Sequence, residues 1–206
     1  MARRTKEDAD ATRNRLLDAA ECVFHEKGVS KASLNDIAQA AGATRGAIYW
    51  HFKDKFDLLD AVMERLRQPL TLDYLDVEPA PGVPALECLR AMIDGIFATV
   101  EGDAHLRRVL EIAMFRVEYV GELSAMRERH LDSLLLLRER FARNLQQASL
   151  DAGVQLPIDI AAAAIGLQGL FDGLLQAWIL SDAGFTLRAH GRGAVDAYLR
   201  GLGFAL

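Results

Sequence analysis

Apolar residues recur at helical spacing along most of the chain, and the alternation of apolar and polar positions that marks a strand is almost absent. The first stripe predicts a helix over about residues 11–27, ended by Gly28; its apolar members are Leu16, Leu17, Ala20, Val23 and Phe24. Residues 1–9 are polar and show no stripe, so we expect them to be mobile. The pattern as a whole indicates an all-α protein.

Two short helices follow, separated by a break at Gly42. Ser33 is a candidate cap for the first, whose apolar positions are Leu34, Ile37, Ala38 and Ala41. Thr44 can cap the second, which is expected over Arg45 to about His51. Two short helices joined by a brief turn containing glycine form a helix-turn-helix, and the second of them can enter the major groove of DNA.

Six further helices are predicted after this motif. The first is capped by Asp54 and is kinked or ended by Pro69. Prolines crowd residues 78–84, which we interpret as a loop. The other five are expected at about 85–101, 104–119, 122–151, 158–181 and 187–203, with boundaries at glycines such as Gly102 and Gly121. About nine helices result, in a three-helix N-terminal domain at 1–55 and a second helical domain at 56–206.

Charge is spread unevenly along the 206 residues. The formal net charge is −5, yet residues 1–67 hold 12 basic and 11 acidic side chains, against 12 and 18 in the remainder. Basic groups cluster at Arg3, Arg4 and Lys6, and again at Arg45, Lys53 and Lys55. An acidic protein with one locally basic end suits contact with nucleic acid through that end. The first cluster either reaches DNA or forms a solvated tail.

Missing patterns exclude several classes of function. The chain has no GxSxG, phosphate-binding loop, HExxH or Cys/His ligand spacing, so we expect no enzyme, metal site or cofactor. The N-terminus lacks the apolar core of a signal peptide, and Cys22 and Cys88 stand alone, which favours the cytoplasm. Residues 160–180 are long and apolar enough to raise the question of a membrane. One central Asp, Asp172, costs about 3 kcal/mol of insertion, which argues against spanning.

The residues around the helix-turn-helix carry a resemblance to a known family. They are Ile37-Ala38, Ala41-Gly42, Gly46, Tyr49, His51-Phe52, Lys55 and Leu58. This pattern is similar to the N-terminal signature of the TetR family of one-component transcriptional repressors. The run TRGAIYWHFKDK most resembles the multidrug efflux-pump repressors of the AcrR/TtgR kind. The resemblance is strong through Arg67 and implies a DNA-binding dimer whose C-terminal helices bind a small effector.

Seven residues in and after the second short helix are candidates for DNA contact. Arg45 is the one side chain there that can bond guanine bidentately, while Gly46 and Ala47 are small enough to let the backbone approach the bases. Groups suited to phosphate contacts are carried by Thr44, Tyr49, His51 and Lys55. The resemblance implies the same division between base-facing and backbone-contacting positions.

Two aromatic residues in the same run have other interpretations. Phe52 is interpreted as a core residue. Trp50 either packs against the first helix, which we favour, or lies along the DNA backbone.

A polar stripe crosses the apolar helix at 158–181. Gln168, Asp172 and Gln176 are spaced i, i+4, i+8 and therefore share one face. The stripe faces either solvent or a cavity in which a few polar groups orient an apolar ligand; because the rest of the helix is apolar, we favour the cavity. Further pocket candidates, although such stripes also form ordinary cores, are Leu66, Met92, Ile96, Leu110, Met114, Phe115, Phe171 and Leu175.

The last two long helices are candidates for a dimer interface. Gly166, Gly169 and Gly173 permit the close approach of a partner helix. The resemblance implies a four-helix interface made by the last two helices of each subunit, with candidates Leu174, Trp178, Val195, Tyr198, Leu199 and Leu202. A dimer also suits DNA binding, because two recognition helices about 34–36 Å apart match a palindrome.

These observations predict a cytoplasmic homodimeric repressor that binds double-stranded operator DNA and does not enter membranes. A hydrophobic small-molecule effector would release it, and the resemblance implies control of a multidrug efflux pump. The alternative is a constitutive DNA-binding dimer without an effector, whose C-terminal half has a filled core. The polar stripe favours the first interpretation.

Overall fold

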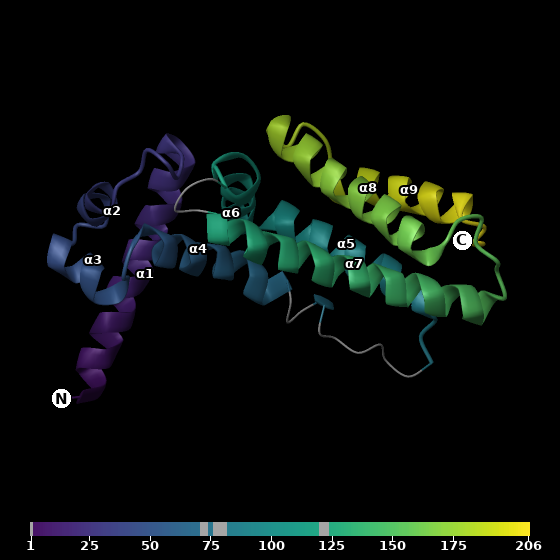
Figure 1. Ribbon diagram of the computed structural model, residues 1–206, viewed down its shortest axis with the longest axis horizontal. Helices are drawn as coiled ribbons and strands as arrows, with labels where there is room; N and C mark the ends of the chain where they lie inside the picture. Colours follow the sequence, from purple (N-terminus) through teal and green to yellow (C-terminus); the bar gives the residue numbers. More distant parts are fainter. Residues whose placement is uncertain (1, 71–73, 76–81, 120–123) are drawn as a thin grey trace. The chain divides into compact units, whose positions relative to one another are not determined.

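The computed structural model describes residues 2–70, 74–75, 82–119 and 124–206. These residues contain nine α-helices and no strand, so the all-α prediction is confirmed (Figure 1). They form two compact units. Unit 1 extends to Gln68 and includes Arg108–Arg129, and unit 2 comprises Pro69–Arg107 and His130–Leu206. The sequence had suggested a boundary at residue 55 instead.

Unit 1 is built on helix α1, Ala2–Lys27. The expectation that residues 1–9 are mobile was wrong for 2–9, which continue the helix. Their sequence has no apolar stripe, but charged residues are good helix formers, and Lys6 and Asp10 are an oppositely charged i,i+4 pair. Gly28, with φ +78°, ends the helix as predicted.

Helices α2 (Leu34–Ala40) and α3 (Arg45–His51) pack on α1 and on each other, and α4 runs from Lys55 to Leu70, one residue beyond Pro69. Ile37, Ile48, Phe52 and Leu58 are fully or almost fully buried in this unit. Helix α6, Ala104–Phe115, contributes most of its length to the same unit and ends four residues before the predicted residue 119.

A fully buried carboxylate joins three helices of unit 1. Glu21 of α1 accepts a hydrogen bond from Arg65 of α4 at 2.5 Å, and its second oxygen lies 4.0 Å from Arg108 of α6. Asp18 also binds Arg65, at 2.7 Å, but its own side chain is exposed. Without Arg65 the buried Glu21 carboxylate would be an uncompensated charge, which is costly. Glu21 therefore holds Arg65, and with it α4, against α1.

Unit 2 contains α5 (Ala85–Gly102), most of α7 (Ser124–Ala152), α8 (Ile160–Leu180) and α9 (Leu187–Gly201). Figure 1 shows α8 and α9 side by side, and α9 also packs on α5. Phe97 and Phe171 stack with ring centroids 5.0 Å apart, and Gly191 leaves the space that the Phe97 ring occupies. Two ion pairs, Arg90 with Asp196 and Arg188 with Asp94, tie α5 to α9.

Parts of two predicted connections lie outside the described residues. These are residues 78–81 of the expected loop and the boundary at Gly121. Gly82 to Pro84 are described and are not helical. Among the described helices, α8 alone is long and apolar enough to cross a membrane by length and composition, a test that the core helix of a soluble protein also passes.

Candidate DNA-binding surface and ligand-binding helix

Both helices of the helix-turn-helix begin at the predicted caps. The Ser33 hydroxyl accepts a hydrogen bond from the amide of Asp36 at 3.1 Å, and the Asp36 carboxylate accepts one from the amide of Ser33 at 3.0 Å. Hydrogen bonds from the Ser33 side chain and from Lys27 lower the pKa of Asp36 to about 2. Thr44 accepts from the amide of Ala47 at 3.1 Å. The reciprocal pair at Ser33 and the single bond at Thr44 fix the first turns of α2 and α3.

One face of α3 is buried and the opposite face is open. Ile48 is fully buried and defines the inner face. At about 100° per residue, Gly46 and Trp50 lie roughly 160° and 200° from Ile48, on the outer pole. Arg45 and Tyr49 lie on one flank, and Ala47 and His51 on the other. Arg45, Gly46, Tyr49 and Trp50 are exposed, while Ala47 and His51 are half-buried.

The flanking side chains are arranged for polar contacts. The Arg45 guanidinium lies 5.7 Å from the centre of the Tyr49 ring, close enough for a cation–π interaction that holds it above α3. The Thr44 oxygen is used as a cap, but its hydroxyl hydrogen stays available to donate. Desolvation, and then the charge of Arg13, lower the pKa of His51, so the ring is neutral at pH 7 and donates one N–H.

The two aromatic residues at the end of α3 differ from each other. Phe52 is buried, as predicted, and caps α3 with its amide bonded to the Ile48 carbonyl. Trp50 is 72% exposed, so the favoured interpretation of a core residue was wrong. Its position five residues after Arg45 turns it to the outer pole, where its ring meets His51 edge-on at 4.5 Å.

Lys55 points into the protein. Its ammonium donates to three backbone carbonyls, Val29 at 2.9 Å and Ser30 and Ala32 at 3.2 Å. The sequence had suggested a phosphate contact for this ammonium. An ammonium has three N–H donors, and all three are used here.

The described part of the chain is thus all-helical and contains a helix-turn-helix whose second helix has an exposed outer face. Residues 16–62 match the family described as bacterial regulatory proteins, tetR family, and residues 84–204 match the C-terminal region of MAATS-type transcriptional repressors. The chain belongs to the tetR family. It is a DNA-binding transcriptional repressor.

Relatives of this tetR-family chain cover nearly its full length. It is 35% identical over 202 residues to the HTH-type transcriptional regulator AcrR of Shigella flexneri, covering 97% of this chain and 93% of that one. NalD, the secondary repressor of the MexAB-OprM multidrug efflux pump in Pseudomonas aeruginosa, has a similar crystal structure, with TM-score 0.81 and 30% identity over 95% of this chain and 98% of NalD. The SmeT–triclosan complex gives a TM-score of 0.77 and 33% identity, covering 92% and 90%.

The polar stripe of α8 in this tetR-family chain is not uniform. Gln168 is buried, but its amide is used within the chain, since it accepts from Arg138 at 2.7 Å and donates to the Leu134 carbonyl at 3.0 Å. Asp172 is half-buried, and Gln176 is exposed. Each i,i+4 step rotates by about 40°, so the stripe turns from core to solvent over eight residues. A cavity position is therefore wrong for Gln176.

Asp172 has a carboxylate that is available to orient a ligand, as the stripe suggested. Its carboxylate has no hydrogen bond or ion pair within the described part of the chain. Burial raises its pKa to about 6, against the opposing charge of Arg138. A carboxyl group in this position can bind a polar or cationic group of a ligand.

The apolar pocket candidates are divided between the two units. Leu66, Leu110, Met114 and Phe115 belong to unit 1, whereas Met92, Ile96, Phe171 and Leu175 belong to unit 2. Most are buried; Met114 and Phe115 are half-buried. Phe171 packs against Phe97 and Phe141 in an aromatic cluster, which is a core position.

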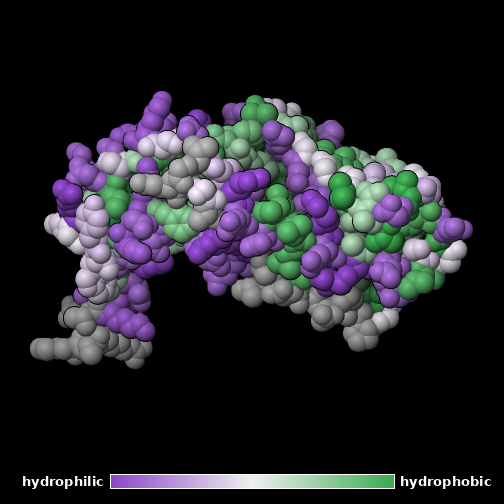
Figure 2. Space-filling view, viewed as in Figure 1, coloured by the Kyte–Doolittle hydropathy of each residue, from purple (hydrophilic) through white to green (hydrophobic). Residues whose placement is uncertain are grey.

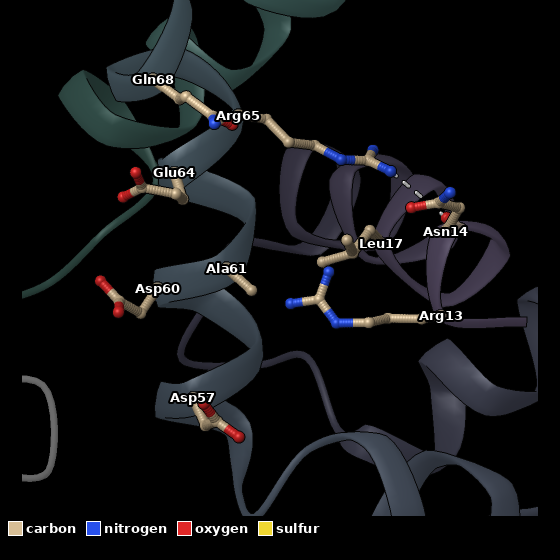
Figure 3. A pocket seen from close by; sticks show the side chains of 9 residues that line it. All are labelled: Arg13, Asn14, Leu17, Asp57, Asp60, Ala61, Glu64, Arg65 and Gln68. Carbon is tan, nitrogen blue, oxygen red and sulfur yellow. Dashed lines mark hydrogen bonds between the residues drawn. The ribbon is translucent and has the colours of Figure 1, made fainter. Parts of the chain in front are cut away.

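A polar cleft lies elsewhere, between α1 and α4 of unit 1 (Figure 3). Its lining is Arg13, Asn14, Leu17, Asp57, Asp60, Ala61, Glu64, Arg65 and Gln68, which includes none of the pocket candidates. In Figure 3 the Arg65 side chain crosses the cleft toward Asn14, and Asp60 and Glu64 point away from α1. Arg65 binds Glu21, and Asp60 binds Arg67 and Arg129, so much of the lining charge is already neutralised.

Four dimer-interface candidates prove to be core residues of the chain itself. Trp178, Val195, Leu199 and Leu202 are each at most 3% exposed, because the apolar stripe of α9 packs on α8 and α5. Their assignment to a dimer surface was wrong. Tyr198 is half-buried and donates its hydroxyl to the Ala163 carbonyl of the same chain at 2.8 Å. Leu174 is also half-buried.

Of the three α8 glycines, one lies against a helix of the same chain and two do not. A Cβ at Gly166 would lie 2.4 Å from the Tyr198 hydroxyl, so this glycine permits the crossing of α8 and α9 within one chain. Gly169 and Gly173 have open space around them. The exposed face of α8 consists of Ala161, Ala162, Ile165, Gly169, Gly173, Gln176, Ala177 and Leu180.

Proposed function

We propose that this tetR-family repressor is a cytoplasmic homodimer without enzymatic activity that binds a palindromic operator and is released by a hydrophobic small molecule. The observation that carries the DNA-binding part is the outer face of α3. Arg45, Gly46, Tyr49 and Trp50 are exposed on a helix whose opposite side is anchored by Ile48. A recognition helix needs this combination of a fixed inner face and an open outer one.

The proposed contacts follow from the position of each residue on α3. Arg45 reads guanine, and Gly46 and Ala47 let the helix backbone approach the bases. Thr44, Tyr49 and His51 donate to phosphates on either side. Trp50 joins this set, since its exposed indole N–H is a donor at the groove wall.

We propose that two chains associate through the exposed face of α8. Most residues of this face are Ala or Gly, whose side chains extend little from the backbone, and Ile165 and Leu180 add exposed apolar area. Close approach of two such faces buries that area and gives the two-fold symmetry that a palindrome requires.

The proposed effector is apolar and carries a group that Asp172 can bind. Support comes from SmeT, whose structure holds triclosan, and from NalD, which is named as a repressor of a multidrug efflux pump. We extend both roles to this chain. The constitutive dimer without an effector is the second candidate, and it is favoured by the burial of Met92, Ile96 and Leu175, which are consistent with a filled core.

The DNA-binding part is tested with operator selected by the protein from a random-sequence pool. Arg45→Ala should weaken operator binding by about 1–3 kcal/mol and flatten the sequence preference. The matched control is Arg127→Ala, which removes the same charge from an exposed position on α7. Equal losses on operator and on random DNA for Arg45→Ala would contradict a base contact.

The effector part is tested by thermal shift with apolar compounds, including triclosan, in the presence and absence of operator. If the proposal holds, a compound that stabilises the protein weakens operator binding, and operator weakens the binding of that compound by the same factor. A compound that binds while leaving operator affinity unchanged would favour the constitutive dimer.

A further inference from the structure

The side chain of Tyr74 packs on α5, and both belong to unit 2. A Cβ at Gly95 would lie 2.4 Å from one carbon of the Tyr74 ring, and 3.1 and 3.3 Å from two others. Carbon atoms that are not bonded do not approach to 2.4 Å, so the ring occupies space that only a glycine leaves open. The ring of Tyr74 therefore lies against the backbone of α5.

The hydroxyl of Tyr74 has a partner on the same helix. It lies 2.6 Å from the hydroxyl of Thr99, and either oxygen can be the donor. Gly95 and Thr99 are spaced i,i+4, so they share one face of α5 about 6 Å apart along the axis. A phenol ring with its oxygen spans a comparable length. The Gly95–Thr99 slot thus combines a floor without side chains and one hydroxyl at its end.

The Gly95–Thr99 slot is reachable from solvent, and its neighbours on α5 are apolar. Tyr74, Gly95 and Thr99 are each half-buried. The buried residues Met92 and Ile96 precede Gly95 and Thr99 by three positions and therefore lie beside them on the helix. A half-buried ring loses less apolar contact on leaving its place than a fully buried one, so the Tyr74 ring can be exchanged for another.

We propose that the Gly95–Thr99 slot is a binding site for the phenol group of a small molecule, and that Tyr74 occupies it in the ligand-free chain. The site does not include Asp172, so it is additional to the effector site proposed above and does not depend on it. A ligand must compete with a phenol tethered in the same chain, whose effective concentration is on the order of millimolar. Simple phenols therefore bind the wild type weakly, and a ligand that succeeds makes further contacts.

Emptying the slot tests this proposal without DNA. p-Cresol is the side chain of tyrosine as a free molecule, and Tyr74→Ala removes its tethered competitor. Isothermal titration should give p-cresol at least about tenfold tighter binding to Tyr74→Ala than to wild type. Tyr74→Phe, which keeps a ring in the slot and guards against a loss of packing, should show no such gain. Equal binding to wild type and Tyr74→Ala, or an equal gain in Tyr74→Phe, would overturn the proposal.

A second substitution shows whether the gain arises at Gly95. In the double variant Tyr74→Ala/Gly95→Ala, the added methyl group takes the space of the ring and should abolish the gained binding. Alanine is a better helix former than glycine, so this change does not weaken α5 itself. Retention of the gained binding in the double variant would place p-cresol elsewhere and refute the slot.

The role of the Thr99 hydroxyl is measured with a pair of ligands. Toluene has the ring and methyl group of p-cresol but lacks the hydroxyl. In the Tyr74→Ala background, Thr99→Val keeps the shape of the side chain and removes its hydroxyl. This change should weaken p-cresol binding by about fivefold and leave toluene binding unchanged. Unchanged p-cresol binding, or equal losses for both ligands, would contradict recognition of a phenol by Thr99.

Discussion

Replacing Asp172 with asparagine should stabilise the protein at neutral pH and leave it unchanged in acid. Burial raises the pKa of Asp172 to about 6 in the folded chain, from the ordinary 3.8. Between these two values the folded chain keeps a proton that the unfolded chain has lost. The contribution of this group to stability therefore falls as pH rises through that window, and the full penalty is present above about pH 6.

The magnitude follows from the difference between the two pKa values. One pKa unit corresponds to about 1.4 kcal/mol, so the full difference gives about 3 kcal/mol as an upper bound. Asp172 is half-buried, and solvent screening reduces the penalty to about 1–2 kcal/mol. For a chain of this length that is a rise in Tm of about 2–8 °C for Asp172→Asn near pH 7.5.

Thermal unfolding of both proteins between pH 3.5 and 7.5 measures this difference. The gap in Tm should be near zero at the acid end and should open as pH rises. Asp132→Asn, at an exposed position on α7, is the control for loss of one negative charge. A gap that is constant with pH, or that widens toward acid, would show that the Asp172 carboxyl is not held in its neutral form by burial.

Two further predictions concern unit 1. Tryptophan fluorescence should report DNA contact through Trp50, because Trp50 is 72% exposed whereas Trp178 is 2% exposed. Quenching of this fluorescence by iodide should fall when operator binds. The variant Trp50→Phe should abolish that change. Identical quenching with and without operator would remove Trp50 from the DNA surface. Glu21→Ala should lower the free energy of unfolding by about 1.5–3 kcal/mol because it removes a charge-assisted hydrogen bond between α1 and α4 and leaves Arg65 with only its exposed acidic partner, Asp18. Asp18→Ala, which removes the exposed partner of the same arginine, should cost at most about 1 kcal/mol by chemical denaturation; equal costs would contradict the role of burial.

The helix-turn-helix was predictable because its signals are local. Ser33, Gly42 and Thr44 specify caps and a turn within a few residues, and the structure places each as expected. The extent of α1 was missed for a related reason. Its first two turns bury no apolar side, so the periodicity that marks the other helices is absent there.

The proposed dimer surface was not predictable from apolar stripes. A stripe shows that one side of a helix is buried, but the covering partner can lie in the same chain or in another. For Val195 and Leu199 it lies in the same chain. The surface of α8 that remains exposed is small and partly polar and carries no apolar stripe, so only its glycines, Gly169 and Gly173, pointed to it.

The direction of the Lys55 side chain was also not predictable from the sequence. Its four-carbon stem can place the ammonium on either side of the backbone, and the three carbonyls that bind it lie 23–26 residues earlier. A motif that records only residue types at fixed spacings contains nothing about such a partner. Gln168 is a similar case, because its partners on α7 are 30 or more residues away.

The short length of α3 makes these distant contacts decisive for DNA reading. A seven-residue helix is far below the length at which helices are stable alone in water, so its place depends on the residues that anchor it. Ile48 and Phe52 hold its inner side by packing, which resists separation more than rotation. Directional bonds resist rotation. Those that flank α3 include the Thr44 cap at its start, and the bond from the Lys53 amide to Asp57 and the three bonds of the Lys55 ammonium after its end. Small changes at residues 28–32 should therefore alter operator affinity although none of those residues belongs to the DNA-facing set.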